Sequence, residues 1–402
     1  MLRRMAWGLG SQGFNSIGNM LLAFWVARES ATTDFGAWSL GYAAFMVALQ
    51  MARAVAATPL LLEVDADRRH WHSGAASGLG VLIASVASIV LLISGTALPS
   101  LRAELWAFSA VIPVAVAQDM LRHVAFSRSR PDLAVLADAT WLCAQIALSV
   151  IALSADAISS PTVALTLAWG AAALVSAVVA AAALRVSVTL TRALAYHRRT
   201  GHLSRALAGD AALGAVGSQS LPMVVAAVAG LAATGALRGG LTLMGPLNIV
   251  ITGLTPVATM EAKKRLAMAG GVQRFVVGWC AALLVLGAAY GALLLVLPDS
   301  VGADALGATW QPAQLLLLPL IIEGLMRGPW SVVPIILRAQ LRVHTALKLK
   351  MVTTLFLLSF PTAGALMSGA IGAAWGVMIS SVASSVASLI VLRAGGPAAP
   401  RA

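Results

Sequence analysis

Charged residues are scarce in this 402-residue chain, at 10% of the total, whereas soluble domains carry roughly 25%. Apolar residues make up 59%. Runs of about 20 apolar residues, the length that crosses a bilayer, recur along the whole chain. A soluble domain is therefore excluded, and the sequence predicts an all-α polytopic membrane protein.

Cysteine and the common catalytic motifs are also lacking. Cys143 and Cys280 lie far apart in apolar runs and form no metal-binding spacing, so we interpret them as small buried residues. The chain has no P-loop, HExxH motif or nucleophile elbow. We expect neither an enzyme nor a bound metal or cofactor. Four metal-capable residues crowd what we expect to be a cytoplasmic loop without a metal-ligand spacing: Asp65, Asp67, His70 and His72.

The apolar runs predict about twelve transmembrane helices. We expect an N-terminal lobe of six spans at 1–184, a basic cytoplasmic linker at 185–205, a C-terminal lobe of six spans at 206–393 and a cytoplasmic tail at 394–402. The first run is too long for the apolar region of a signal peptide. The spans are expected at about 6–27, 35–57, 73–98, 105–126, 132–154, 162–184, 206–231, 235–259, 275–297, 312–336, 351–368 and 371–392.

Basic residues gather at alternate ends of these spans. Of the 27 Lys and Arg residues, 22 fall at span ends on one side of the membrane. The other five are Arg28, Arg102 and Arg238, at span ends on the opposite side, and Arg53 and Arg327, inside spans. By the positive-inside rule both termini are cytoplasmic, and we expect a multi-pass protein of the cytoplasmic (inner) membrane. The net charge of +12 therefore reflects topology rather than nucleic-acid binding.

A weak internal repeat relates the two halves at an offset of about 200 residues. It predicts two six-helix lobes in the same orientation, with a substrate site in a central cavity between them. The matches are Gly-Ser-Gln at 10–12 and 217–219, Gly-Ala at 36–37 and 235–236, Thr-Pro at 58–59 and 255–256, and residues 118–122 against 323–327.

The first span carries a polar face. Gln12, Asn15, Ser16 and Asn19 fall within about a 100° sector of one helix. Such amides face either a wet cavity or hydrogen-bonding neighbours, because lipid would leave them unsatisfied. We expect the cavity, with Gln219 as the repeat counterpart of Gln12.

Arginine within a span is costly, about 2.5–3.5 kcal/mol at the bilayer centre. Arg238 shares a helix face with Thr242, with Asn248 at the edge, and Gly245-Pro246 should bend or loosen that helix. Arg238 either lines a cavity or extends to the interface, and the same alternatives hold for Arg53.

Acidic residues offer candidates for ion coupling. Glu323 and Arg327 lie four apart in one span and can pair. They form either a structural ion pair or a site at which Glu323 titrates and Arg327 binds an anion. Asp119, Asp138 and Asp210 lie near cytoplasmic helix ends, where an interfacial or paired position is favoured over proton transport; Asp210 is kept as a second candidate.

The embedded charges favour an anionic substrate. Guanidinium binds phosphate through two parallel hydrogen bonds, so Arg53, Arg238 and Arg327 suit a diphosphate with a bulky polar head. In the linker, Arg192, Tyr196 and Arg199 have helical spacing and are expected to lie along anionic lipid headgroups. Glycine pairs at 74/78, 287/291, 324/328 and 372/376 are expected to pack helices within the chain.

Three stretches resemble the polysaccharide flippases, of the O-antigen translocase type, in the multidrug/oligosaccharidyl-lipid/polysaccharide (MOP) exporter superfamily. They are residues 10–28 (GSQGFNSIGNMLLAFWVAR), residues 34–59 with the start FGAWSLGYAAF, and residues 236–256 with LRGGLTLMGPLNIV. The six-plus-six arrangement and the length agree with that family.

The resemblance implies a cavity lined by spans 1, 2, 7 and 8, and alternating access by rocking lobes. The substrate would be a polyprenyl-pyrophosphate-linked oligosaccharide, used for cell-surface polysaccharide. By position, Arg53 and Arg238 match the basic cavity residues, and Gln12 and Asn15 match the polar face of span 1. Membrane lipids and polysaccharide polymerase or assembly proteins are the implied partners.

Three alternatives stay open. A cation-coupled multidrug-type exporter is disfavoured because span 1 lacks the acidic residue that this branch often has. A membrane polysaccharide polymerase or ligase would need a sizeable outer loop, and little beyond Asp299 and Asp304 is available there. The last alternative is a non-transporting scaffold in a polysaccharide assembly complex.

Overall fold

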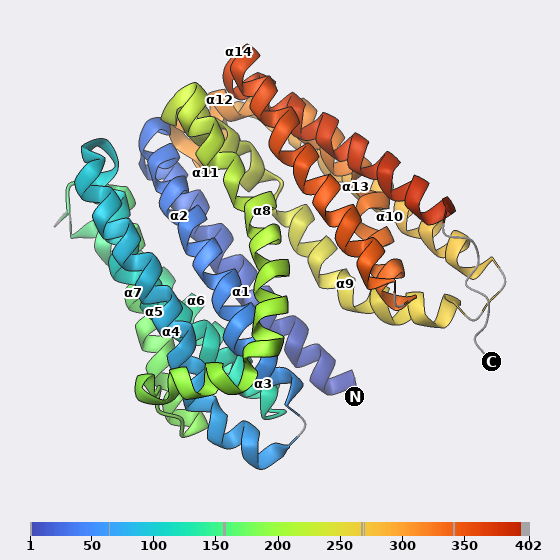
Figure 1. Ribbon diagram of the computed structural model, residues 1–402. Helices are drawn as coiled ribbons and strands as arrows, with labels where there is room; N and C mark the ends of the chain where they lie inside the picture. The colour runs from blue at the N-terminus through green and yellow to red at the C-terminus, as the bar shows by residue number, and fades with distance from the viewer. Residues whose placement is uncertain are drawn as a thin grey trace. The chain divides into compact units, whose positions relative to one another are not determined.

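In a computed structural model of the chain, the described residues are 2–63, 65–155, 158–266, 268, 270–340 and 342–394. Helices dominate these ranges, which contain no strand (Figure 1). The chain divides into two compact units, Met1–Ala215 and Val216–Ala402. The lobes at 1–184 and 206–393 and the linker at 185–205, which were expected from the sequence, remain predictions. Nearly all of the expected tail, 395–402, lies outside the described residues.

Unit 1 is a bundle whose long helices begin at predictable places. Pro131 and Pro161 open two of them, where the missing N–H of proline removes no helical hydrogen bond. The indole of Trp38 is fully buried and donates to the Thr166 hydroxyl at 2.9 Å. The elements are α1 (Leu2–Glu29), α2 (Thr32–Ala52), η1 (Arg53–Ala57), α3 (Thr58–Leu62), α4 (Ala66–Ala97), η2 (Pro99–Leu101), α5 (Arg102–Ser127), α6 (Pro131–Ser154), α7 (Pro161–Leu184), η3 (Leu190–Arg192) and the first part of α8 (Ala193–Leu243).

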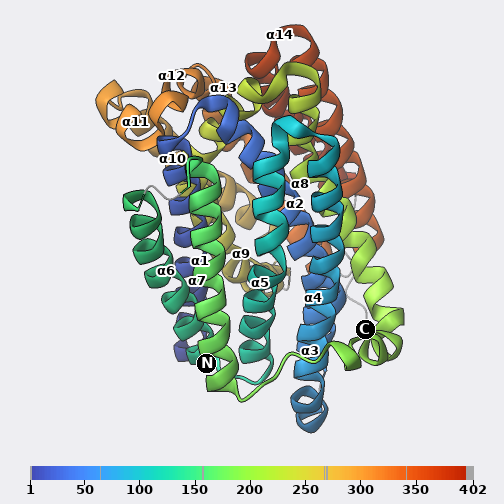
Figure 2. The same cartoon turned by 90° about the vertical axis from the view of Figure 1, so that its left-hand side faces the viewer.

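Unit 2 contains two long helices that reverse direction. In α8 the reversal is at Gly230 (φ 85°), and in α14 it is at Ser368 and Gly369 (φ 58°), where glycine avoids the strain of positive φ. Figure 2 shows the short α11 and α12 side by side at one end of α13. After α8 the elements are α9 (Gly245–Leu266), α10 (Gly271–Leu295), α11 (Asp299–Leu306), η4 (Gly307–Thr309), α12 (Trp310–Gln314), α13 (Leu317–Ala339) and α14 (Val343–Ala394).

The two arms of α14 touch backbone to backbone. A Cβ at Gly372 would meet the carbonyl of Gly364, and a Cβ at Gly376 would meet the backbone of Phe360 and Pro361. The other three glycine pairs also face neighbours in the same chain, so their predicted role in internal packing is confirmed. Gly74 and Gly78 contact Ser187 and Thr189, Gly287 and Gly291 contact Leu325 and Ile321, and Gly324 and Gly328 contact Met244 and Cys280.

The loosening predicted at Gly245-Pro246 is confirmed: the span expected at 235–259 is interrupted at Met244, because Pro246 has no N–H to continue the helical hydrogen bonds. The Tyr290 hydroxyl donates to the Leu243 carbonyl at 2.6 Å beside the break.

Two local predictions were wrong. The loop expected around Asp65–His72 is mostly helix, since α4 already begins at Ala66. His72 is buried there, with its ring centroid 5.4 Å from that of Tyr196. Cys143, which was expected to be buried, is exposed on α6.

The fold class predicted from the sequence is confirmed. Within the described ranges, nine helices are long and apolar enough to cross a membrane. The segment His344–Ala394 reverses at Gly369 and so provides two crossings, and the stretch after Gly230 joins α9 to provide another. With α1 the total is about twelve transmembrane helices.

Candidate functional site

A polar cluster of unit 1 begins at Arg53, where α2 passes into the π-helical turn η1. Its Nε donates to Asp119 Oδ2 at 2.8 Å, and its Nη2 donates to Asp119 Oδ1 at 2.7 Å. Asp119 lies on α5 and is buried, with a side chain only 3% exposed. This is the bidentate geometry that favours guanidinium over ammonium.

Further charges extend this cluster through the bundle. Arg122 Nη2 lies 3.1 Å from Asp119 Oδ1, and Arg122 Nη1 lies 3.6 Å from Asp138 Oδ2 on α6. The Ser11 hydroxyl of α1 donates to Asp138, and Gln118 Nε2 donates to it at 3.2 Å. Opposite charges therefore balance within helices of membrane-spanning length, as the cost of burial requires.

The π-helical turn that carries Arg53 is held by the linker. The Tyr196 hydroxyl donates to the Ala56 carbonyl at 3.1 Å, and the Ser204 hydroxyl donates to the Val55 carbonyl at 3.0 Å. Burial raises the pKa of Tyr196, which keeps its hydroxyl a donor. The linker residues are thus bonded to the backbone beside Arg53, and π-helical turns are frequent at functional sites.

The same linker presents a basic, aromatic surface. The guanidinium carbons of Arg192 and Arg199 each lie 5.5 Å from the ring centroid of Trp71. Trp71 is half exposed, at 52%, and Leu194 is exposed beside Arg192 in sequence at 62%. Exposed arginine, indole and leucine together suit the interface between headgroups and acyl chains.

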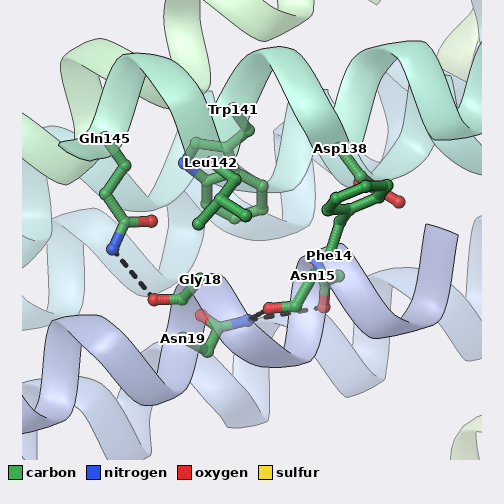
Figure 3. Close-up of a pocket in the computed structure, with 8 residues that line it drawn as sticks. All are labelled: Phe14, Asn15, Gly18, Asn19, Asp138, Trp141, Leu142 and Gln145. Carbon is green, nitrogen blue, oxygen red and sulfur yellow. Dashed lines mark hydrogen bonds between the residues drawn. The ribbon is translucent and has the colours of Figure 1, made fainter. Parts of the chain in front are cut away.

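A shallow hollow lies between α1 and α6 (Figure 3). Asn15 and Asn19 enter it from α1, and Asp138 and Gln145 from α6. Asn19 Nδ2 donates to the Asn15 carbonyl at 2.9 Å, while Gln145 Nε2 donates to the Gly18 carbonyl at 2.8 Å. The polar face predicted for the first span is therefore directed in part at another helix.

In unit 2 the predicted pairing of Glu323 and Arg327 on α13 is confirmed. Arg327 Nε and Nη2 donate to the two Glu323 carboxylate oxygens at 3.1 and 2.7 Å. Arg327 also donates to Asn248 Oδ1 of α9, and its guanidinium lies 5.8 Å from the Trp330 ring centroid. The Trp330 indole in turn donates to Ser381 at 3.0 Å.

The remaining predicted residues have more local contacts. Gln12 is exposed and donates to Ser16 at 3.2 Å, and Gln219 donates to its neighbour Ser218 at 3.1 Å. The buried Thr242 hydroxyl bonds to the Arg238 carbonyl at 2.8 Å, and Asp210 is exposed. Because of the break at Met244, Thr242 and Asn248 do not share one continuous helix.

Sequence reasoning missed the roles of Ser11, Gln118 and Arg122. The predicted pairing of Asp119 and Asp138 is confirmed, but their partners were not identified. The available signal was the spacing of Asp119 and Arg122, three apart in an apolar run, which places both on one helix face. Nothing in the sequence joins Ser11 to Asp138, 127 residues away.

No family model matches this sequence, and no curated protein matches it either. The structure, in contrast, resembles solved transporters. An inward-facing multidrug resistance MATE family transporter of the MOP superfamily aligns with a TM-score of 0.73 and 13% identity over 96% of both chains.

Two further solved structures are similar. The lipid II flippase MurJ, in an inward closed conformation, aligns with a TM-score of 0.68 and 10% identity, covering 98% of this chain and 88% of MurJ. A MOP superfamily transporter from Pyrococcus furiosus aligns at 0.59 and 14% identity, covering 98% and 94%. The chain thus has the MATE/MOP transporter fold.

Proposed function

We propose that this chain is a flippase that moves a polyprenyl-pyrophosphate-linked oligosaccharide across the cytoplasmic membrane by alternating access. Its proposed role is cell-surface polysaccharide synthesis, in the O-antigen translocase branch of the superfamily. A fold shared with a lipid II flippase supports a lipid-linked substrate. The superfamily fold itself supports transport rather than catalysis.

The position of Arg238 is the observation that carries this proposal. It lies eight residues beyond the reversal at Gly230, about 12 Å along a helix. The two glycines that follow it pack on Thr309 and Leu320, so this part of α8 is in the packed interior of unit 2. Arg238 lies near the start of the expected span 235–259, where it can reach either the interface or a cavity, and its half-buried side chain supports the cavity and an anionic ligand.

The proposed substrate-binding residues combine amides and guanidiniums, which donate to sugar hydroxyls and phosphate oxygens. The basic linker with Trp71 is proposed to lie on anionic headgroups, with both termini cytoplasmic in the inner membrane. The proposed binding residues are Gln12, Asn15, Asn19, Arg53, Gln219, Arg238, Thr242, Asn248 and Arg327, with Glu323 and Asp210 as candidates for ion coupling.

The test is binding of undecaprenyl-pyrophosphate-linked glycan to the purified protein, by native mass spectrometry and thermal shift. We expect the lipid-linked glycan to stabilise the wild type, and both Arg238→Ala and Arg238→Lys to lose that stabilisation. Lysine keeps the charge but cannot form the two parallel hydrogen bonds. Arg102→Lys is the matched control, since Arg102 opens α5, stacks on Trp106 and donates to the Gly95 carbonyl.

Equal binding by wild type and Arg238→Lys would refute the ligand role of Arg238. No stabilisation by the glycan, together with a response to cationic drugs, would replace the flippase by a cation-coupled exporter. Glu323, buried and paired with Arg327, would then be the residue to test next.

A further inference from the structure

In the ion pair of Arg53 and Asp119, the arginine side chain is partly exposed and the aspartate side chain is buried. The Arg53 side chain is 32% exposed, against 3% for Asp119. The Arg122 side chain, on the other side of Asp119, is 5% exposed. Arg53 is thus the member of this cluster that an incoming anion can reach.

Asp119 has a second cation beside it, since Arg122 Nη2 lies 3.1 Å away, and the ring nitrogen His123 Nδ1 lies 3.3 Å away. Within the described ranges, the buried Nε of Arg122 has no hydrogen-bond partner, so this guanidinium can form further bonds. Removing one member of a buried pair is usually costly because the other charge is left uncompensated. Here Asp119 keeps its contact with Arg122, which it shares with Asp138, when Arg53 leaves.

The contact that Arg53 makes is also one that a diphosphate can reproduce. Its Nε and Nη2 bind two oxygens of one carboxylate at 2.8 and 2.7 Å. Phosphate offers the same fork two oxygens with more negative charge. A diphosphate that replaces Asp119 on Arg53 therefore substitutes one bidentate anion for another. The other contacts of Asp119 are not broken.

The corresponding helix pair of unit 2 is arranged differently. There Arg327 is held by Glu323 of its own helix, four residues away, and the partner from α9 is the neutral Asn248. The Arg327 side chain is only 16% exposed. In unit 1, Arg53 is partly exposed and is held by Asp119 of another helix, and Asp119 also contacts a second arginine, Arg122. Among the described residues, unit 2 has no such arrangement.

We propose that Asp119 is an internal competitor for the substrate's diphosphate. It holds Arg53 until two diphosphate oxygens take its place, after which it stays paired with Arg122. The inference rests on the proposed function and deepens it, because it assigns Asp119 a role in setting the affinity of the site for diphosphate. Asp119 is a positioning residue and does not touch the substrate.

The experiment titrates the purified full-length protein with geranylgeranyl diphosphate in native mass spectrometry, with geranylgeraniol as the uncharged control. If Asp119 leaves Arg53 free in about a tenth of the molecules, Asp119→Asn should tighten the apparent Kd roughly tenfold. Arg53→Gln combined with Asp119→Asn should abolish this gain. Asp132→Asn is the matched control, because it breaks the exposed pair with Arg130 and changes the net charge equally.

An unchanged or weaker affinity in folded Asp119→Asn would overturn the inference, as would a gain that survives in the double variant. If the wild type still binds the lipid-linked glycan, such a result leaves the proposed function in place. If neither the wild type nor any variant binds a diphosphate, both are refuted.

A second measurement decides the case if Asp119→Asn does not fold. Because Asp119 keeps its contact with Arg122, Arg53→Gln should lower the melting temperature by no more than about 3 °C. Arg122→Gln, which leaves Asp138 without its ion-pair partner, should lower it further. A drop for Arg53→Gln as large as that for Arg122→Gln would contradict the exchange.

Discussion

At the residue scale, the polar side chains of α1 divide between two environments. The Ser11 hydroxyl is fully buried against Asp138, whereas neighbouring Gln12 is exposed. The sequence predicted the polar face from Gln12, Asn15, Ser16 and Asn19 but omitted Ser11, because serine is common in membrane helices and gives little signal alone. Its partner could not be predicted, since 127 residues separate it from Asp138.

Replacing Ser11 with alanine should destabilise unit 1. The substitution removes a donor from the buried Asp138 carboxylate, and hydrogen bonds between membrane helices contribute about 0.6–1.7 kcal/mol each. We expect a lower melting temperature for the purified protein in detergent.

Ser16→Ala is the control for this prediction. The Ser16 hydroxyl accepts from exposed Gln12 on the same helix, so its loss should change the melting temperature little. A melting temperature for Ser11→Ala equal to that for Ser16→Ala would show that the bond to Asp138 contributes nothing to stability.

At the element scale, glycine and proline decided where the sequence prediction succeeded. The break expected between spans 351–368 and 371–392 is confirmed at Ser368 and Gly369. The loosening expected at Gly245-Pro246 within the span 235–259 is also confirmed, since Pro246 lacks the N–H that would continue the helix past Met244. The turns of α4 from Ala66 were assigned to a loop because their side chains are polar. A helix that extends beyond a bilayer retains its backbone hydrogen bonds whatever its side chains.

Substitution of Gly372 should separate the arms of α14. A Cβ there meets the Gly364 carbonyl, and backbone atoms cannot rotate away as a side chain would. Overpacking of this kind costs about 1–3 kcal/mol. We expect Gly372→Ala to lower the melting temperature of the protein and its yield from membranes.

Gly278→Ala provides the matched control within a helix. A Cβ at Gly278 meets nothing within 4 Å, and alanine favours helix by up to about 1 kcal/mol over glycine. This variant should be as stable as the wild type or more stable. If Gly278→Ala and Gly372→Ala melt alike, the close contact in α14 is not important for stability.

At the scale of the whole molecule, composition alone predicted an all-helical membrane protein of about twelve spans, and the structure confirms it. The predicted superfamily fold is matched by solved transporters at 10–13% identity. At such identity only the fold is shared, because apolar patterning is retained after individual side chains have changed. The branch and the substrate therefore depend on binding experiments rather than on resemblance.

The proposed topology can be tested in cells. Basic residues at alternate span ends predict cytoplasmic termini. A green fluorescent protein fused at the C-terminus should therefore fluoresce, and alkaline phosphatase fused after Leu98, between α4 and α5, should be active outside. A dark C-terminal fusion together with inactive phosphatase would contradict this orientation.

The π-helical turn at Arg53–Ala57 also bears on how the chain tolerates insertions and deletions. Such a turn accommodates one residue more than an α-helix would over the same rise. Deleting a single alanine from it should remove that extra residue and restore continuous α-helix, while the residues on either side keep their directions. The carbonyls of Val55 and Ala56, which accept from the linker residues Ser204 and Tyr196, would then return to regular helical hydrogen bonds. The attachment of the linker beside Arg53 is thus encoded in the length of the chain as well as in its letters.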